Sequence, residues 1–355
     1  MSERRPMRFA ALCAAQFLLA CGLSRAAGTG QTCDRACLHG LMDEYLAALV
    51  AHDPTRLATT PGVKFTENTN RMALGDGLWH TIDRLGSFRL YVEDPETRQA
   101  AFYGTVKENG VTALLGVRLQ ESGRRVDQIE TFVIRQATGI HGEFDNLVRA
   151  EPIWEKSIPS PQRSSRQTMV RIANRYFEGI VQGNGAIVPF AEDFSRIENG
   201  LQTAGGPASA AHAESEAAQF SSKRFNYIHE ITDRRFLLVD PERGLVYAVV
   251  MFQHPGNIKT DLFAPARRGT GAASGPGTGA GARTGANGGT IRPRGFSLAS
   301  YPNTTQIIEL FRIRGGKIQR IFAYVSLLPY RQRPGWSSGM SRKQESAASA
   351  LRRGR

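Results

Sequence analysis

The sequence predicts an α+β protein built from two related copies of one domain. Its length supports this, because 355 residues are enough for two domains of ordinary size. Each half also has the same order of predicted elements, a helix followed by strands. Most directly, a set of anchors recurs in one order, which marks an internal duplication. The anchors are Tyr45, Glu67-Asn68, Asp94-Pro95-Glu96 and Gly110 in the first half, and Tyr176, Glu198-Asn199, Asp240-Pro241-Glu242 and Gly256 in the second.

Each half opens with a predicted amphipathic helix. Apolar residues fall at helical spacing over Leu38–Leu49 and again over Met169–Ile180. Ser164 and Gln167 have the spacing of a capping box ahead of the second helix, and Gly183 is suited to end it.

Strands follow in each half, after a loop-rich stretch that ends at Val63–Thr66 or at Phe194–Ile197. Asp-Pro, Asn-Gly and Gly-Gly turn signals separate the strands. A helix followed by a long antiparallel meander is an α+β pattern. The predicted strands are Phe88–Val92, Ala100–Lys107, Thr112–Leu119 and Val126–Arg135 in the first half, and Phe236–Val239, Leu245–Gln253, Thr305–Arg314 and Ile318–Leu327 in the second.

The composition sets the predicted domain boundaries. A stretch rich in Gly, Ala, Thr, Pro and Arg interrupts one hairpin of the second half, and such a composition is typical of disorder. We therefore expect a signal peptide at 1–26, a first domain at 32–150, a linker at 151–165, a second domain at 166–336 with a disordered insert at 264–295, and a disordered basic tail at 337–355.

The N-terminal region has the features of an export signal. Three arginines within the first eight residues precede an apolar run that is too short to span a bilayer. Ser24–Ala26 suits an ordinary signal peptidase, whereas Leu18–Cys21 resembles the bacterial lipobox, which would place a lipid anchor on Cys21. We expect an exported protein that is periplasmic or secreted, or alternatively an outer-membrane lipoprotein. No other segment is apolar enough for a transmembrane helix.

Two cysteines remain in the predicted folded part, Cys33 and Cys37. Their spacing places both on one face of a helix, and in an oxidising compartment a local disulfide is expected. A redox motif would need Cys-x-x-Cys, and a zinc site would need more ligands than His39.

The net charge of +13 is unevenly distributed. Most of the excess lies in residues 1–26, 257–298 and 342–355, so the predicted domains are close to neutral. Because loose basic ends do not form a surface that follows a phosphate backbone, we predict no specific nucleic-acid binding.

Two resemblances add to this interpretation. The hairpin at Ile308–Ile318 resembles the last hairpin of the nuclear transport factor 2-like superfamily. The chain also resembles a family of uncharacterised secreted proteins with two such domains in tandem, over about residues 32–336. The stretches that carry the second resemblance are Cys33–Leu38, Thr66–Asn68 with Leu74–Trp79, and Arg234–Phe236 with Phe252–Gly256.

The superfamily resemblance implies two cone-shaped domains, each with a helix over a curved antiparallel sheet and an apolar pocket between them. Relatives such as SnoaL-like polyketide cyclases, scytalone dehydratase and ketosteroid isomerase use this pocket for acid–base chemistry, whereas others only bind or dimerise. The fold therefore does not settle the function. Single domains commonly pair through their sheets, which implies an intramolecular pseudo-dimer here.

Tyr45 and Tyr176 occupy matched places on the opening helices. Each hydroxyl could polarise a ligand carbonyl, or each ring could be a core aromatic. Glu67 and Glu198 end matched segments. Each carboxylate could transfer a proton beside an apolar pocket, or form turn structure with the left-handed Asn that follows.

Among the 7 histidines, His80 and His254 lie where a pocket residue could be, although a structural role is the simpler interpretation. The histidines lack metal-ligand spacing, so no metal is expected. Arg118 and Glu130 lie on adjacent strands, where a cross-strand ion pair is expected rather than catalysis. Nucleophile-elbow, phosphate-loop and dinucleotide motifs are absent from the sequence, so no cofactor is expected.

The function predicted from sequence is binding of a small apolar molecule by an exported tandem-domain protein. The alternative is a cofactor-free lyase, isomerase or cyclase. In that case Tyr45 and Glu67 would act in the first pocket, and Tyr176, Glu198 and His254 in the second.

Overall fold

The computed structural model describes residues 33–136, 142–205, 215–256, 283–284, 290–291 and 301–336. The predicted signal peptide, the lipid anchor at Cys21 and the basic tail 337–355 lie outside the described residues. Of the insert 264–295, only the strands β11 (Arg283–Thr284) and β12 (Thr290–Ile291) are described, and they pair with each other. The described residues from Cys33 onward belong to one compact unit.

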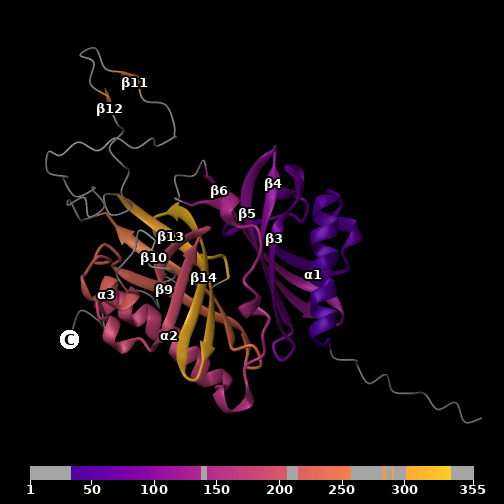
Figure 1. Cartoon of the computed structure of the whole chain (residues 1–355). Helices are drawn as coiled ribbons and strands as arrows, with labels where there is room; N and C mark the ends of the chain where they lie inside the picture. The colour runs from indigo at the N-terminus through magenta and orange to yellow at the C-terminus, as the bar shows by residue number, and fades with distance from the viewer. Residues whose placement is uncertain are drawn as a thin grey trace, which may run out of the picture. The chain divides into compact units, whose positions relative to one another are not determined.

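Each half contains one long helix and a six-stranded sheet (Figure 1). The first half consists of α1 (Arg35–Val50), β1 (Thr59–Glu67), β2 (Asn70–Met72), the 3-10 turn η2 (Gly77–His80), β3 (Ile82–Asp94), β4 (Gln99–Glu108), β5 (Val111–Ser122) and β6 (Arg125–Arg135). The second consists of α2 (Arg166–Gln182), β7 (Phe190–Glu198), β8 (Leu201–Gly205), α3 (Glu216–Ser221), β9 (Glu230–Asp240), β10 (Leu245–Pro255), β13 (Pro302–Arg314) and β14 (Lys317–Pro329).

The two sheets have the same topology. Their strand orders are β2-β1-β6-β5-β4-β3 and β8-β7-β14-β13-β10-β9, so each strand of one sheet has a counterpart in the other. This confirms the predicted α+β class and the two tandem domains. The connection between the halves packs against them, since Phe144 and Trp154 are buried.

The helix ends show which side chains begin and end each element. At the start of α1, Asp34 accepts a hydrogen bond from the Cys37 backbone N–H at 2.9 Å. The predicted capping box at Ser164 is wrong by one residue, because the hydroxyl that caps α2 is that of Ser165, which accepts from the Thr168 N–H. Gly183 ends α2 with a φ of 59°, as predicted.

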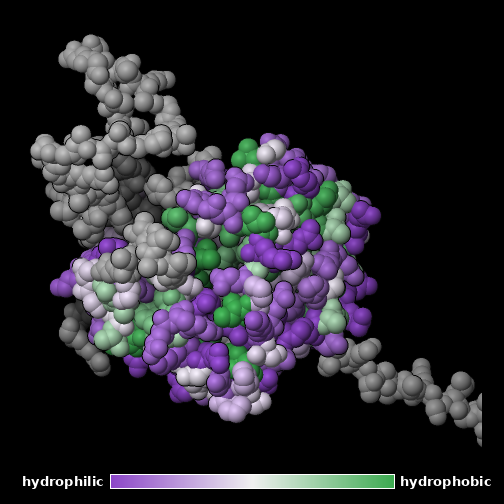
Figure 2. All heavy atoms as spheres, viewed as in Figure 1, coloured by the Kyte–Doolittle hydropathy of each residue, from purple (hydrophilic) through white to green (hydrophobic). Residues whose placement is uncertain are grey.

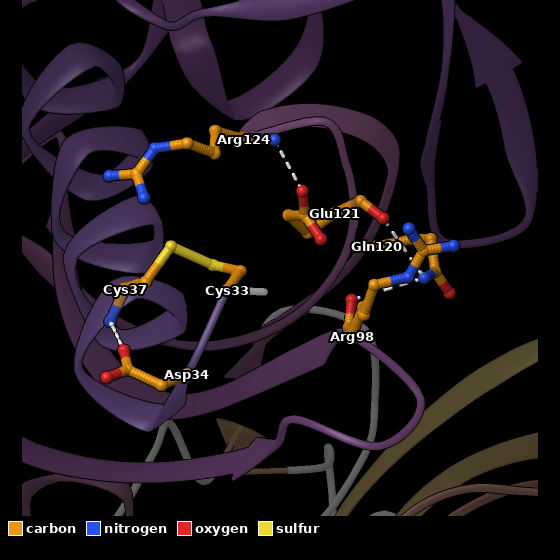
Figure 3. Close-up of a disulfide and its surroundings, with 7 residues drawn as sticks. All are labelled: Cys33, Asp34, Cys37, Arg98, Gln120, Glu121 and Arg124. Carbon is orange, nitrogen blue, oxygen red and sulfur yellow. Dashed lines mark hydrogen bonds between the residues drawn. A yellow bond between two sulfur atoms is a disulfide. The ribbon is translucent and has the colours of Figure 1, made fainter. Parts of the chain in front are cut away.

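The predicted disulfide between Cys33 and Cys37 is present at the start of α1 (Figure 3). It lies beside the turn between β5 and β6, in which the Arg124 N–H donates to Glu121 Oε1 at 2.5 Å. The disulfide therefore ties Cys33, which precedes α1, to the first turn of that helix.

The stretches expected to be loop-rich before the strands are instead strands β1 and β7. Each pairs in parallel with the last strand of its half, β6 or β14, so the two sheets are mixed rather than wholly antiparallel. The hydrogen-bond partners of these strands come from far along the chain, and a local pattern does not contain them.

The duplicated Asn68 and Asn199 extend this parallel pairing. Asn68 donates from Nδ2 to the Val133 carbonyl at 2.9 Å and accepts from the Val133 N–H at 2.8 Å. Asn199 makes the same pair of bonds with Val325, at 3.1 and 2.9 Å. Both residues have the predicted left-handed backbone, with φ of 45° and 47°. The side-chain amide thus replaces the next peptide group of the strand.

The two faces of each sheet are covered differently. Helix α1 packs against β3 and β4, and α2 packs against β9, β10, β13 and β14. The other faces meet each other: the Tyr103 ring lies 5.8 Å from that of Tyr247, and the Tyr324 hydroxyl donates to the Gly104 carbonyl at 3.0 Å. The halves therefore share a buried layer between their sheets, with the helices on the outer sides (Figure 1).

Arginines at the helix starts hold the halves together reciprocally. Arg166, the first residue of α2, contacts Asp94 of the first half at 2.5 Å. Arg35, the first residue of α1, contacts Asp240 of the second half at 2.8 Å. Each aspartate begins one copy of the duplicated Asp-Pro-Glu turn, so equivalent residues contact each other in both directions.

Hydrophilic residues predominate on the face shown in Figure 2, and the hydrophobic ones form separate small patches. Within the described ranges, the large hydrophobic side chains that are exposed are those of Val111, Val148 and Val181. No helix in the part of the chain that the structure describes is long and apolar enough to cross a membrane.

Candidate functional site

In the first half, Tyr45 and Glu67 both lie in the interior below α1. The Tyr45 ring packs edge-on against Trp79 at 5.6 Å, and burial, followed by the charge of Glu67, raises the pKa of the Tyr45 hydroxyl. Glu67 is 8% exposed and accepts from the Leu78 N–H at 2.9 Å, with Arg135 at 3.8 Å. Burial raises the pKa of Glu67. The hydrogen bond from the Leu78 N–H and the charge of Arg135 lower it, and so offset part of this increase.

The Glu67 carboxylate is held in place by the backbone of η2. A Cβ at Gly77 would lie 2.5 Å from Glu67 Oε2, and Gly77 has a φ of 69°, so this close approach requires glycine. Because one carboxylate oxygen caps the first turn of η2, Glu67 has a structural role in addition to any chemistry.

In the second half, the Tyr176 hydroxyl donates to Glu216 Oε1 at 2.9 Å. Tyr176 lies on α2 and Glu216 opens α3, a short helix that the sequence analysis did not predict. Both side chains are about 2% exposed. The phenol of Tyr176 therefore reaches a carboxylate inside the protein, with the aromatic rings of Phe220 and Phe311 packed around it at 5.3 and 5.5 Å.

Arg196 gathers three carboxylates around one guanidinium group. Its Nη1 lies 2.7 Å from Glu198 Oε2, its Nη2 lies 3.3 Å from Glu309 Oε1, and its Nε lies 4.0 Å from Glu216 Oε1. We call Tyr176, Arg196, Glu198, Glu216 and Glu309 the buried acid cluster. Glu309 is fully buried, whereas the Glu198 side chain is 31% exposed.

Two carboxylate oxygens of this cluster have no hydrogen-bond partner among the described residues. They are Oε2 of Glu216 and Oε2 of Glu309, and both are inaccessible to solvent. Burial raises the pKa of both carboxyl groups, and it raises that of Glu309 to about 7, although Arg196 acts in the opposite direction. A carboxyl group with this pKa can donate or accept a proton near neutrality.

The first half lacks this cluster, as the strand registers show. In the second half, Arg196 pairs with Ile321 on β14. The equivalent residue of the first half is Phe65, which pairs with Ile129 on β6. Likewise, Glu309 pairs with Ala323 in the second half, and its equivalent in the first half is Val117, which pairs with Thr131. The duplicated positions therefore carry two apolar residues in the first half and a buried ion pair in the second.

Sequence reasoning missed Arg196, Glu216 and Glu309. One signal was available: Glu309 is a lone carboxylate in the apolar run Ile307–Phe311 of a strand buried on both faces. A charge at such a position is almost never left without a partner or a task. The partner could not be read from the sequence, because Arg196 lies on a strand that was expected to be mostly loop.

His254 lies at the end of β10, apart from the contacts of the buried acid cluster. It is 2% exposed, and its Nδ1 is 2.6 Å from Asn303 Oδ1. Burial lowers the pKa of His254, which favours the neutral ring, and the Tyr227 ring packs 5.3 Å away. His80 is largely exposed beside Asp76.

The predicted cross-strand pair of Arg118 and Glu130 is confirmed, with Arg118 Nε 3.2 Å from Glu130 Oε2. Arg235 of the second half joins it at 2.6 Å, so this pair belongs to the layer between the sheets. Within the ranges that the structure describes, no group of three or more His, Cys, Asp and Glu side chains is placed to hold a metal ion.

Residues 162–325 match a family described as "Domain of unknown function (DUF8021)". No curated protein matches the chain. Similar solved structures include a candidate polyketide cyclase from Silicibacter sp. TM1040, with 16% identity and a TM-score of 0.28 over 45% of this chain and 90% of that one. An epoxide hydrolase/cyclase-like enzyme of pyran ring formation in the polyether salinomycin has 14% identity and a TM-score of 0.27, over 47% and 98% of the two chains. A candidate isomerase from Bacillus subtilis has 10% identity and a TM-score of 0.25, over 45% and 87%.

The protein is a tandem pair of α+β domains with the nuclear transport factor 2-like fold, as the element order and sheet topology of each half define it. Residues 162–325, in its second half, match the domain of unknown function, in agreement with the predicted resemblance to an uncharacterised family. Likeness at these identities concerns the fold and does not extend to an activity.

Proposed function

We propose that the protein binds a small, mostly apolar molecule in the cone-shaped interior of its second half, against the buried acid cluster. The observation that carries this proposal is the divergence between the halves. Arg196 and Glu309 stand where the first half has the apolar pair Phe65 and Val117, so at these two positions one copy of the domain has a buried ion pair and the other does not.

The unpartnered oxygens of Glu216 and Glu309 support a ligand with an oxygen function. A buried polar atom without a partner costs about 1–3 kcal/mol, and this cost is removed when a ligand hydroxyl or carbonyl occupies the position. Protonated Glu309 would donate to a carbonyl, whereas the ionised form would accept from a hydroxyl. The aromatic rings around Tyr176 suit an apolar ligand body.

A second candidate function is cofactor-free acid–base catalysis by a lyase, isomerase or cyclase. The pKa of Glu309, raised to about 7, favours it, because a general acid or base works best when its pKa is near the working pH. In this proposal Glu309 moves the proton, Tyr176 turns its hydroxyl from Glu216 to the substrate oxygen and polarises it, and Glu198 pairs with the Arg196 guanidinium. Tyr45 and Glu67 in the first half, and His254 in the second, remain secondary candidates.

We also propose that the chain is exported and that its halves form an intramolecular pseudo-dimer. The Cys33–Cys37 disulfide supports an oxidising compartment, either periplasmic or secreted, or an outer-membrane lipoprotein with its lipid on Cys21. The reciprocal contacts of Arg35 and Arg166 support a two-fold relation between the halves, in which covalent linkage replaces association of separate chains.

The test is a thermal-shift screen of small polyketides and terpenoids against the wild type, Glu309→Gln and Glu67→Gln. Both variants replace a buried carboxylate by an isosteric amide, so Glu67→Gln is the matched control in the other half. We expect a ligand that raises the melting temperature of the wild type and of Glu67→Gln. The same ligand should bind Glu309→Gln with a Kd at least about tenfold higher and stabilise it correspondingly less. A ligand that stabilises all three proteins equally would contradict the proposal.

Mass spectrometry of the same mixtures separates the two candidate functions. Conversion of the ligand by the wild type, abolished in Glu309→Gln while the ligand still binds, would establish catalysis. Binding without conversion would establish the binding function alone.

A further inference from the structure

A second feature of the chain points to a ligand and is independent of the proposed function: it lies at the tip of the β13–β14 hairpin, beside the segment that precedes α2. The tip of the β13–β14 hairpin carries Arg312, Arg314 and Lys317 within six positions. Among the described residues, none of these three cations lies within ion-pair distance of a carboxylate. A hollow of about 360 Å³ opens beside the tip. It is lined by Gln162, Ala191, Asp193, Arg314, Gly315, Lys317 and Gln319.

Arg312 is the least expected of these cations, because it is 3% exposed. Among the described residues, its guanidinium donates to three neutral oxygens: the carbonyls of Lys156 at 3.0 Å and Arg243 at 2.6 Å, and Gln319 Oε1 at 3.4 Å. A buried charge without a counter-ion is costly. Burial lowers the pKa of Arg312, and repulsion from Arg314 and other nearby arginines lowers it further.

Gln319 connects this buried guanidinium to the hollow. The amide accepts from Arg312 and donates from Nε2 to Asp193 Oδ2 at 2.6 Å. Asp193 is thus already engaged, and it also lies 3.7 Å from Arg320. Arg320 in turn pairs with Glu151 at 3.4 Å. Glu151 and Asp193 are therefore both shared with Arg320.

The charge balance around the hollow identifies the class of ligand. Two cations, Arg314 and Lys317, and one carboxylate, that of Asp193, line the hollow, and Asp193 is shared with Arg320 and Gln319. Arg314 and Lys317 therefore have no carboxylate partner among the described residues, and a phosphate or sulfate group would supply the missing negative charge. Arg314 and Lys317 flank the Gly315-Gly316 turn, and the exposed ends of their side chains can contact separate oxygens of one group.

We propose that this hollow at the β13–β14 hairpin binds a tetrahedral oxyanion group, with Arg314 and Lys317 as its direct contacts. Arg312 stabilises the bound anion from within the protein, through its charge. The group can belong to a soluble phosphate or sulfate or to a lipid headgroup, since the chemistry of the contacts is the same.

The double variant Arg314→Gln/Lys317→Gln tests the site, since both side chains are exposed and the fold should persist. The equivalent hairpin of the first half supplies the matched control, Arg124→Gln/Arg125→Gln, which removes the same charge from exposed positions in the β5–β6 turn and at the start of β6. Isothermal titration with inorganic phosphate and with sulfate, at ionic strength matched with chloride, should show binding by the wild type and the control. The Arg314→Gln/Lys317→Gln protein should bind at least about tenfold more weakly.

Co-sedimentation with phosphatidylcholine vesicles, with and without phosphatidylglycerol, distinguishes the sources of the group. If the Arg314→Gln/Lys317→Gln protein loses phosphate or sulfate binding but still sediments with phosphatidylglycerol vesicles, the ligand is a soluble anion. If it loses only the phosphatidylglycerol-dependent sedimentation, the ligand is a lipid headgroup. Either result supports the site. The proposal is overturned if phosphate, sulfate and vesicles all fail to bind the wild type, or if both double variants lose binding equally. Neither outcome depends on the buried acid cluster.

Discussion

Replacing Glu309 by Gln should stabilise the protein at neutral and alkaline pH while changing little in acid. Glu309 is fully buried, and its pKa is raised from the ordinary 4.5 to about 7. The folded protein therefore holds this proton more tightly than the unfolded chain does. Below about pH 4.5 the carboxyl group is protonated in both states and costs nothing extra.

The cost develops as the pH rises. Between about pH 4.5 and 7 the unfolded chain loses the proton and the folded protein keeps it, so the free energy of unfolding falls. Above the folded pKa the buried carboxylate is ionised, and the full cost is about 3 kcal/mol. Gln has the shape of the protonated acid and can still accept from Arg196, so Glu309→Gln avoids this cost.

Urea unfolding of the wild type and Glu309→Gln, followed by tryptophan fluorescence at about pH 5, 6, 7 and 8, measures the effect. The variant's advantage should be small at the lowest pH and approach about 3 kcal/mol at the highest. Glu198→Gln is the control, because Glu198 contacts the same guanidinium with a partly exposed side chain. A stability difference that is flat across this pH range, or a variant less stable at about pH 8, would refute the reasoning.

Two further predictions concern the architecture. Asn68→Ala and Asn199→Ala should each lower the free energy of unfolding by about 1–3 kcal/mol, because each leaves a strand N–H and a carbonyl without partners; urea titration would count against this role if either loss were below about 0.5 kcal/mol. Arg166→Met should cost about 3–5 kcal/mol, because it leaves the buried Asp94 without its arginine. Arg35→Met should cost clearly less, because a second arginine also binds its aspartate partner, and equal losses in the two unfolding curves would contradict that explanation.

Much of the fold followed from local patterns. The spacing of Asp-Pro and Asn-Gly turns located eight strands, and helical periodicity located α1 and α2, because these elements satisfy their own backbone or pair with a chain neighbour. The left-handed Asn68 and Asn199 were also predictable, since a short polar side chain tolerates that backbone. Strands β1 and β7 were not, because their parallel partners lie more than half a domain away in the chain.

The candidate site divides in the same way. The sequence alone identified a duplication and pointed to Tyr176 and Glu198, because repeated positions can be recognised by comparing the two halves of one chain. Only the tertiary structure brought Arg196, Glu216 and Glu309 together, from β7, α3 and β13. The pKa and the energetic role of a charged group depend on its partners and on its loss of hydration, and both are determined only when distant segments pack together.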